Sequence, residues 1–149
     1  MTIKLELPEI ETIRRDLDRE ISGRKVKAAE AASMAVLGRY HNRKAFTGRL
    51  VGRKLGDVRR VGLHLLVGLD GEDLLVIRLG AGSLLRRHTG RDAVAPGTEL
   101  TITFTQGGQV RLIDPDGTSE VCIVAAEDLL TELAAPGFTV ATSADLPGL

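Results

Sequence analysis

Short apolar runs separated by glycine-containing turns occupy the chain from residue 50 to residue 125. Between Glu99 and Thr105, three apolar residues alternate with three threonines, which is the period of a strand with one buried face. Asp-Gly at 70–71 and Gly-Gly at 107–108 join neighbouring runs, and such pairs are typical of β-hairpins. The sequence therefore predicts antiparallel strands. The strand-like runs are 26–32, 50–51, 58–61, 63–69, 74–79, 99–105, 110–113 and 120–125.

Two helices are predicted beside these strands. Over Pro8–Ile21, apolar residues recur at spacings of three and four, and acidic residues at 9 and 11 face the positive end of the helix dipole. Glu127–Leu133 is predicted as a short late helix, and residues 33–48 as a long loop. We therefore expect an α+β domain over residues 1–135, a two-layered antiparallel β-sandwich flanked by an N-terminal helix and a late helix. Residues 136–149 are expected to be a C-terminal linker or tail.

Length and composition narrow the class of protein. The chain has 149 residues, enough for one domain, and its one cysteine, Cys122, excludes an internal disulfide framework. We expect Cys122 to be a buried, inert thiol. No apolar run approaches the ~20 residues of a membrane-spanning helix, and the first residues lack a signal-peptide pattern. We therefore expect a cytoplasmic protein, associated with the nucleoid if it binds DNA, and no membrane partner.

The zero formal net charge conceals an asymmetry. Residues 1–111 hold all 20 Lys and Arg with 13 acids, whereas residues 112–149 hold seven acids and no Lys or Arg. The basic excess is densest between Arg39 and Arg60. Such a block favours an anionic partner, most commonly nucleic acid, or else it is a solvated basic surface balanced by the acidic segment. Charge alone leaves both interpretations open.

The sequence predicts neither a metal site nor a cofactor. It contains no Cys-x-x-Cys, and its three histidines lie 23 and 24 residues apart. The glycine-rich stretch at 79–83 lacks the third glycine of a dinucleotide fingerprint and the Gly-Lys-Ser/Thr of a P-loop, so we interpret it as a tight turn.

The start of the predicted helix carries a specific motif. Residues 6–15 read Glu-Leu-Pro-Glu-Ile-Glu-Thr-Ile-Arg-Arg. This string resembles the opening signature of the formamidopyrimidine-DNA glycosylase/endonuclease VIII family of base-excision repair enzymes. Further similar segments follow in order at 58–60, 77–80 and 112–115. The resemblance runs from about residue 5 to about residue 133 and covers the family's N-terminal domain, a β-sandwich flanked by helices.

The resemblance assigns roles to several residues. Glu6 matches a glutamate that assists opening of the sugar ring, and Glu9 matches a glutamate near the damaged base. As candidate catalytic residues, both are carried over from the family motif. The resemblance together with the basic strand predicts four contacts to DNA phosphates, at Arg59, Arg60, Arg78 and Arg86.

Other family positions hold residues that cannot perform the family's chemistry. Leu5 replaces the N-terminal proline whose amine attacks the sugar, and Leu63 replaces a phosphate-binding lysine. Ala81 is too small to fill the space of a flipped base. Asp116 and Gly117 replace two arginines, and Thr118 replaces a wedge phenylalanine. The resemblance also implies that the family's helix–two-turn–helix and zinc-finger modules are absent from this sequence.

Three hypotheses about function follow. The leading one is a catalytically degenerate module that binds duplex DNA weakly. This module would act as an accessory to a protein partner or to missing C-terminal domains. The second is an active glycosylase and AP lyase for oxidised bases that uses Glu6 and Glu9, with the amine of Thr2 or Lys4 as nucleophile. The third is a repurposed domain that binds a protein or a small molecule and no DNA. Enzymatic activity is therefore left open, with the sequence favouring its loss.

Overall fold

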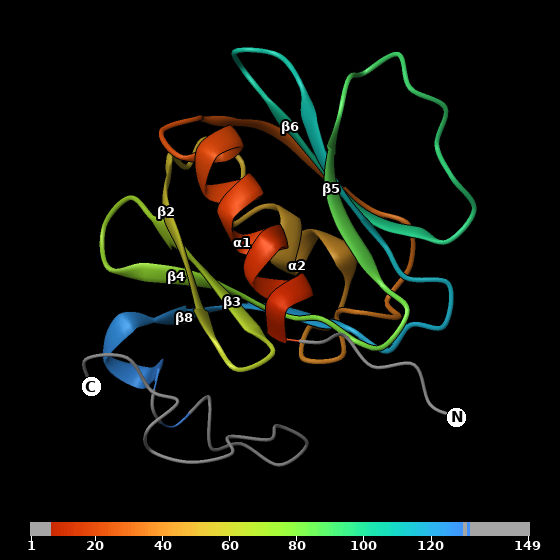
Figure 1. Ribbon diagram of the computed structural model, residues 1–149. Helices are drawn as coiled ribbons and strands as arrows, with labels where there is room; N and C mark the ends of the chain where they lie inside the picture. The colour runs from red at the N-terminus through yellow and green to blue at the C-terminus, as the bar shows by residue number, and fades with distance from the viewer. Residues whose placement is uncertain (1–6, 130, 132–149) are drawn as a thin grey trace.

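Two four-stranded antiparallel sheets face one another, as the computed structural model shows for residues 7–129 and 131 (Figure 1). The first sheet has the order β1-β6-β7-β5 and the second has the order β2-β3-β4-β8. The strands of the first sheet are β1 (Val26–Ala31), β6 (Thr98–Phe104), β7 (Gln109–Ile113) and β5 (Leu84–His88). Those of the second are β2 (Leu55–Val61), β3 (His64–Leu69), β4 (Asp73–Arg78) and β8 (Glu120–Ala125). The predicted α+β sandwich is confirmed.

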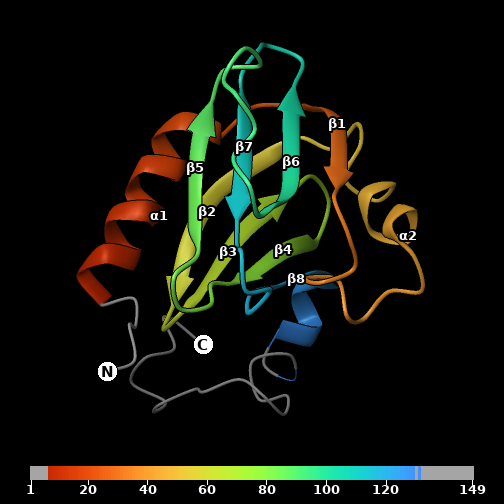
Figure 2. The same cartoon turned by 90° about the vertical axis from the view of Figure 1, so that its right-hand side faces the viewer.

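Helices lie along the sides of this sandwich. The helix α1 (Leu7–Ile21) lies beside β5 and β2, and α2 (Arg43–Thr47) lies beside β1 at the opposite side (Figure 2). A 3-10 helix, η1 (Ala126–Asp128), follows β8. The predicted late helix over 127–133 is thus described only at its start, and the predicted tail over 136–149 lies outside the described residues. No helix in the described part combines the length and apolar character needed to cross a membrane.

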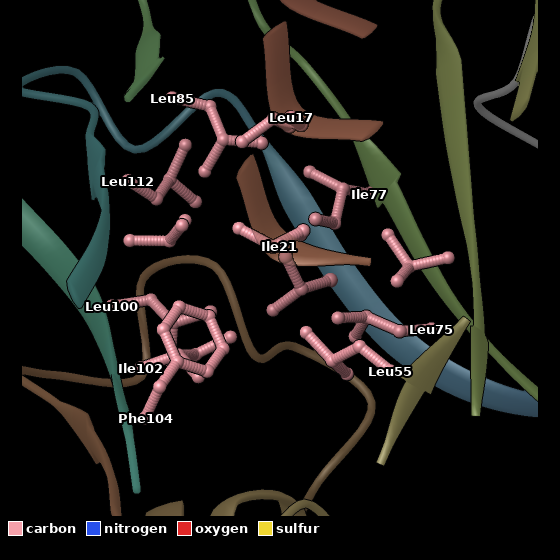
Figure 3. A pocket seen from close by; sticks show the side chains of 13 residues that line it. Leu17, Ile21, Leu55, Leu75, Ile77, Leu85, Leu100, Ile102, Phe104 and Leu112 are labelled. Carbon is pink, nitrogen blue, oxygen red and sulfur yellow. The ribbon is translucent and has the colours of Figure 1, made fainter. Parts of the chain in front are cut away.

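The sandwich interior is built from alternate residues of the facing strands. In β6 the burial alternates strictly, with Leu100, Ile102 and Phe104 inside and the intervening residues half-buried. Leu17 and Ile21 of α1 complete the same core, as Figure 3 shows. The space left between these side chains is about 10 Å³. Such a void holds at most about one water molecule, so the interior offers no site for a small molecule.

The polar face of α1 completes the free edge of β2. Asp18 Oδ1 accepts the Val58 N–H at 2.9 Å, and Arg14 Nη1 donates to the Val58 carbonyl at 3.1 Å. Ser22 Oγ donates to the Gly56 carbonyl at 3.0 Å. Because the hydrogen bond from Val58 stabilises the ionised carboxylate, the pKa of Asp18 lies below its usual value. The edge of the second sheet is therefore satisfied by side chains at helical spacing.

Three predicted boundaries differ from the structure. The expected loop over 33–48 contains α2, which begins where the side chain of Asn42 accepts the Ala45 N–H at 2.8 Å. Residues 50–51, predicted as a strand, form a turn, and β2 begins at Leu55. The strand β5 was not predicted, because three of its five residues are basic. Cys122 is buried in β8, as expected.

Candidate nucleic-acid interface

Four segments meet at the end of the sandwich that lies lowest in Figures 1 and 2. They are the start of α1, the β2–β3 turn at 62–63, the β4–β5 loop at 79–83 and the β7–β8 loop at 114–119. The Leu79 N–H donates to the Leu63 carbonyl at 3.3 Å, which joins the second segment to the third. We call this region the loop end. It contains several of the positions that the family resemblance assigns to DNA.

The β4–β5 and β7–β8 loops are fastened to one another. The Gly80 N–H donates to Ser119 Oγ at 2.9 Å, and Ser83 Oγ donates to the Gly80 carbonyl at 2.7 Å. Asp114 is fully buried and accepts the Ser119 N–H at 2.7 Å. A Cβ atom on Gly80 would overlap the Thr118 hydroxyl and lie 2.6 Å from the Thr118 Cβ, so only glycine fits there. The two loops therefore form one unit.

A cluster around Glu11 fixes the first turns of α1 to β2. Arg14 Nη2 contacts Glu11 Oε2 at 2.7 Å, and Arg60 Nε contacts Glu11 Oε1 at 3.1 Å. Hydrogen bonds from Arg14 and then Arg60 lower the pKa of Glu11 from 4.5 to about 2. Sequence reasoning gave Glu11 only a helix-dipole role. The arginines three and four residues later were a local signal for this cluster, but Arg60 lies 49 residues away.

Of the two candidate catalytic glutamates, the structure describes one. Glu9 is exposed in the first turn of α1, and Glu6 lies outside the described residues. The relative position of the two carboxylates is therefore not given. Glu9 is exposed at the loop end, to which the start of α1 belongs.

The four arginines predicted to contact phosphate lie in different surroundings. Arg60 forms an ion pair with Glu11, and its Nη1 donates to the Gly62 carbonyl at 3.3 Å. Arg78 is half-buried and is the last residue of β4, at the loop end. Arg59 is 70% exposed and contacts Asp57 at 3.0 Å. Arg86 is exposed in the middle of β5, between the first sheet and α1. The structure therefore brings Arg60 and Arg78 to the loop end but not Arg59 or Arg86.

The loop end is apolar and acidic where the family resemblance predicts basic or wedge residues. Leu63 is 37% exposed in the β2–β3 turn, and Ala81 is exposed in the β4–β5 loop. Asp116 and Thr118 are exposed in the β7–β8 loop. These side chains supply no cation for a phosphate and no aromatic wedge for a base stack.

Much of the basic block between residues 39 and 60 is neutralised by distant acids. Arg39 contacts Glu120 at 2.9 Å, and Arg53 contacts both Asp70 and Asp73, the latter at 3.2 Å. These hydrogen bonds raise the pKa of Arg53 and lower the pKa of Asp70. The block is thus no continuous cationic surface, which favours the interpretation of paired surface charge over that of a single anion site.

The described residues contain no group of three or more His, Cys, Asp and Glu side chains that could hold a metal ion. The described part of the loop end offers arginines, Glu9 and backbone groups. That donor set can bind a phosphodiester and accept a proton.

Comparison with known proteins gives a consistent result. A family model described as formamidopyrimidine-DNA glycosylase N-terminal domain matches residues 5–121. A formamidopyrimidine-DNA glycosylase of Acidothermus cellulolyticus is 37% identical over 115 residues, covering 73% of this chain and 39% of that protein. The corresponding protein of Azorhizobium caulinodans is 32% identical over 136 residues, covering 83% of this chain and 46% of that protein.

Solved structures show the same fold. The Lactococcus lactis Fpg (MutM), in complex with DNA containing N7-benzyl-Fapy-dG, aligns with a TM-score of 0.78 at 25% identity. The alignment covers 86% of this chain and 46% of that one. A complex of the same protein with DNA containing an abasic site gives the same TM-score and identity. The present chain spans less than half the length of these relatives.

Proposed function

Because this chain belongs to the formamidopyrimidine-DNA glycosylase family through its N-terminal domain, we propose that it is a DNA-associated binding module without glycosylase activity. The observation that carries the proposal is the composition of the loop end. Its architecture is that of the family, yet it presents Leu63, Ala81 and Asp116 at positions where the family resemblance predicts groups that act on DNA.

The loss of activity rests on chemistry that the retained residues cannot supply. The family's attacking group is an N-terminal secondary amine, and an internal amide nitrogen at Leu5 is no nucleophile. Extrusion of a base costs a few kcal/mol, which wedge and pocket contacts must offset. Ala81 and Thr118 are too small to provide those contacts. We place such a module in the cytoplasm, at the nucleoid.

Binding would depend on the four arginines that the family resemblance matches to phosphate contacts. We assign phosphate contacts to Arg59 and Arg78, with Arg60 available when its pair with Glu11 opens and Arg86 as a peripheral contact. Asp116 repels phosphate, so we expect weak binding that falls steeply with salt.

Fluorescence anisotropy with undamaged and abasic-site duplexes tests this proposal. We expect both duplexes to bind at low salt with similar affinity. Arg59→Ala and Arg78→Ala should each weaken binding and reduce the salt slope by about 0.9. Lys27→Ala, which removes an exposed charge from β1, is the matched control and should leave the slope unchanged. Absence of binding at low salt, or equal effects of all three variants, contradicts the proposal.

A second candidate is an AP lyase, favoured by the exposure of Glu9 in the first turn of α1. Such an enzyme would form a Schiff base between a protein amine and the sugar of an abasic site. Borohydride reduction traps that adduct covalently. A trapped adduct that is lost in Glu9→Gln would establish the lyase and overturn the binding-only proposal, whereas no adduct at saturating DNA excludes it.

A further inference from the structure

The second sheet is apolar on both of its faces. In β3, Leu65 and Val67 lie in the core between the sheets, whereas Leu66 points to the opposite, outer face and is also buried. Leu66 is in register with Val76 of β4, and Val76 is in register with Cys122 of β8. All three side chains belong to one buried cluster. Continuous apolar runs of this kind are typical of strands that are covered on both sides.

The outer face of the first sheet is polar at the comparable positions. Thr101 of β6 is in register with Arg111 of β7, and Thr103 is in register with Gln109. Arg111 donates to the Ala93 carbonyl of the β5–β6 loop at 3.1 Å, so a polar contact holds that loop over this face. The requirement for an apolar cover therefore belongs to the second sheet.

The cover of that outer face begins within the described part of the chain. Val76 and Cys122 are 1% and 3% exposed in a single chain, so the chain itself supplies their cover. Among the described residues, Tyr40 and Leu129 pack onto this cluster from outside the sheet. Leu129 follows η1, which lies beyond β8 from the first sheet (Figure 1). The chain therefore turns onto the outer face as it leaves β8.

We propose that the outer face of the second sheet binds the chain's own C-terminal segment, residues 132–149, which continues the cover that Leu129 begins. These residues lie outside the described part of the structure, and their sequence fits this role. Nine of the 18 are apolar, among them Leu133 and Phe138, and only Glu132 and Asp145 are charged. Docking of this segment adds a third layer to the sandwich.

The segment is long enough to cross the sheet. Four strands spaced about 4.8 Å apart make a sheet about 15 Å wide, and 18 residues reach about 27 Å even as a helix. A second copy of the chain, or a separate partner, is a poorer occupant of this face. Either one would have to bind Val76 and Cys122, which a single chain already buries.

A spin label in the segment tests where it binds in the full chain. Thr139→Cys, in a Cys122→Ala background, carries the label, and NMR follows the methyl signals of Leu66 and Val76. We expect the label to broaden both. The methyl signals of Val94, which lies with Thr101 on the outer side of the first sheet, should stay sharp. Spin-labelled chain without isotopes, mixed with isotope-labelled chain without the spin label, should produce no broadening.

The reactivity of the Cys122 thiol gives a second readout without the label. The double variant Leu133→Asp/Phe138→Asp puts two charges into the segment, and an apolar face disfavours a buried charge. We expect the rate of Cys122 modification to rise at least roughly tenfold, because the cover opens more often. Val94→Asp makes the same chemical change at a side chain that is 67% exposed and should leave the rate unchanged.

Three results would overturn the proposal. Sharp signals for Leu66 and Val76 in the spin-labelled chain would mean that the segment binds elsewhere or nowhere. Broadening in the mixed sample would assign the face to a second copy of the chain. A rate of Cys122 modification that the double variant does not change would mean that other residues form the cover. These measurements involve no DNA, so this proposal and the DNA-binding proposal can fail independently.

Discussion

The helix α1 lies between two sheet edges and serves them differently. Toward β2, Arg14, Asp18 and Ser22 recur every four residues and satisfy the backbone of Gly56 and Val58. Toward β5, Ile13, Asp16, Leu17 and Glu20 of the helix line a groove, and no described group of the helix hydrogen-bonds the backbone of the strand. A helix completes a strand edge where its polar side chains reach the strand's backbone, and it leaves that backbone without partners where a groove separates the two.

The largest effect is expected from removing the partner of Val58. Asp18→Ala deletes a charged acceptor and should lower the free energy of unfolding by about 2 kcal/mol. Asp16→Ala, on the same helix and paired with Arg19 at the surface, should change it by less than about 0.5 kcal/mol. Urea denaturation measures both variants. Equal stabilities would mean that α1 does not seal the β2 edge.

A smaller effect is expected at the edge of β8. Tyr40→Phe removes the hydroxyl that accepts the Ile123 N–H while keeping the ring against Phe46, so about 1 kcal/mol of stability should be lost. Burial raises the pKa of Tyr40, so the hydroxyl stays neutral across the physiological range. Hydrogen exchange at Ile123 should accelerate in the variant, and unchanged protection there would contradict the assignment.

The stability that Glu11 contributes should be lost in acid. Its pKa lies near 2 in the folded chain, below the ordinary 4.5, so its carboxylate stabilises the fold above about pH 4.5. That stabilisation is lost as the pH falls from 4.5 toward 2. Urea denaturation between pH 6 and pH 2.5 should therefore show a steeper loss of stability in the natural chain than in Glu11→Gln. Parallel curves would show that the Arg14–Glu11–Arg60 cluster contributes nothing.

The smallest effect is expected at β5. Arg86→Ala removes an exposed side chain from an open edge and should change stability by less than about 0.5 kcal/mol. In the natural chain, the β5 amides that point away from β7 should exchange faster than the Val58 amide. Slower exchange at β5 would mean that this edge is already covered, and the contrast with β2 would disappear.

Local patterns predicted most of this fold. The alternation in β6, the Asp-Gly hairpin and the period of α1 are signals carried within about 15 residues, and all three elements formed. The strand β5 was missed because Arg86, Arg87 and His88 break the alternation, and neighbours from another part of the chain hold it in place. Tertiary pairing overrides weak local propensity at such an edge.

The candidate site was predictable only in part. The motif at the start of α1 identified the family and the loop end. The neutralisation of the basic residues was not predictable, because Arg39 and Glu120 are 81 residues apart and Arg60 and Glu11 are 49 apart. No local pattern reports such pairs, and the net charge of a segment does not reveal where its counter-charges lie.

The contact between Gly80 and Thr118 has a mechanical consequence. The β4–β5 loop carries the chain from the second sheet to the first, and the β7–β8 loop carries it back. Where these two loops contact one another, they join the two sheets. A force applied to either loop is therefore transmitted to both sheets, and a variant that weakened this contact would make that end of the sandwich less rigid.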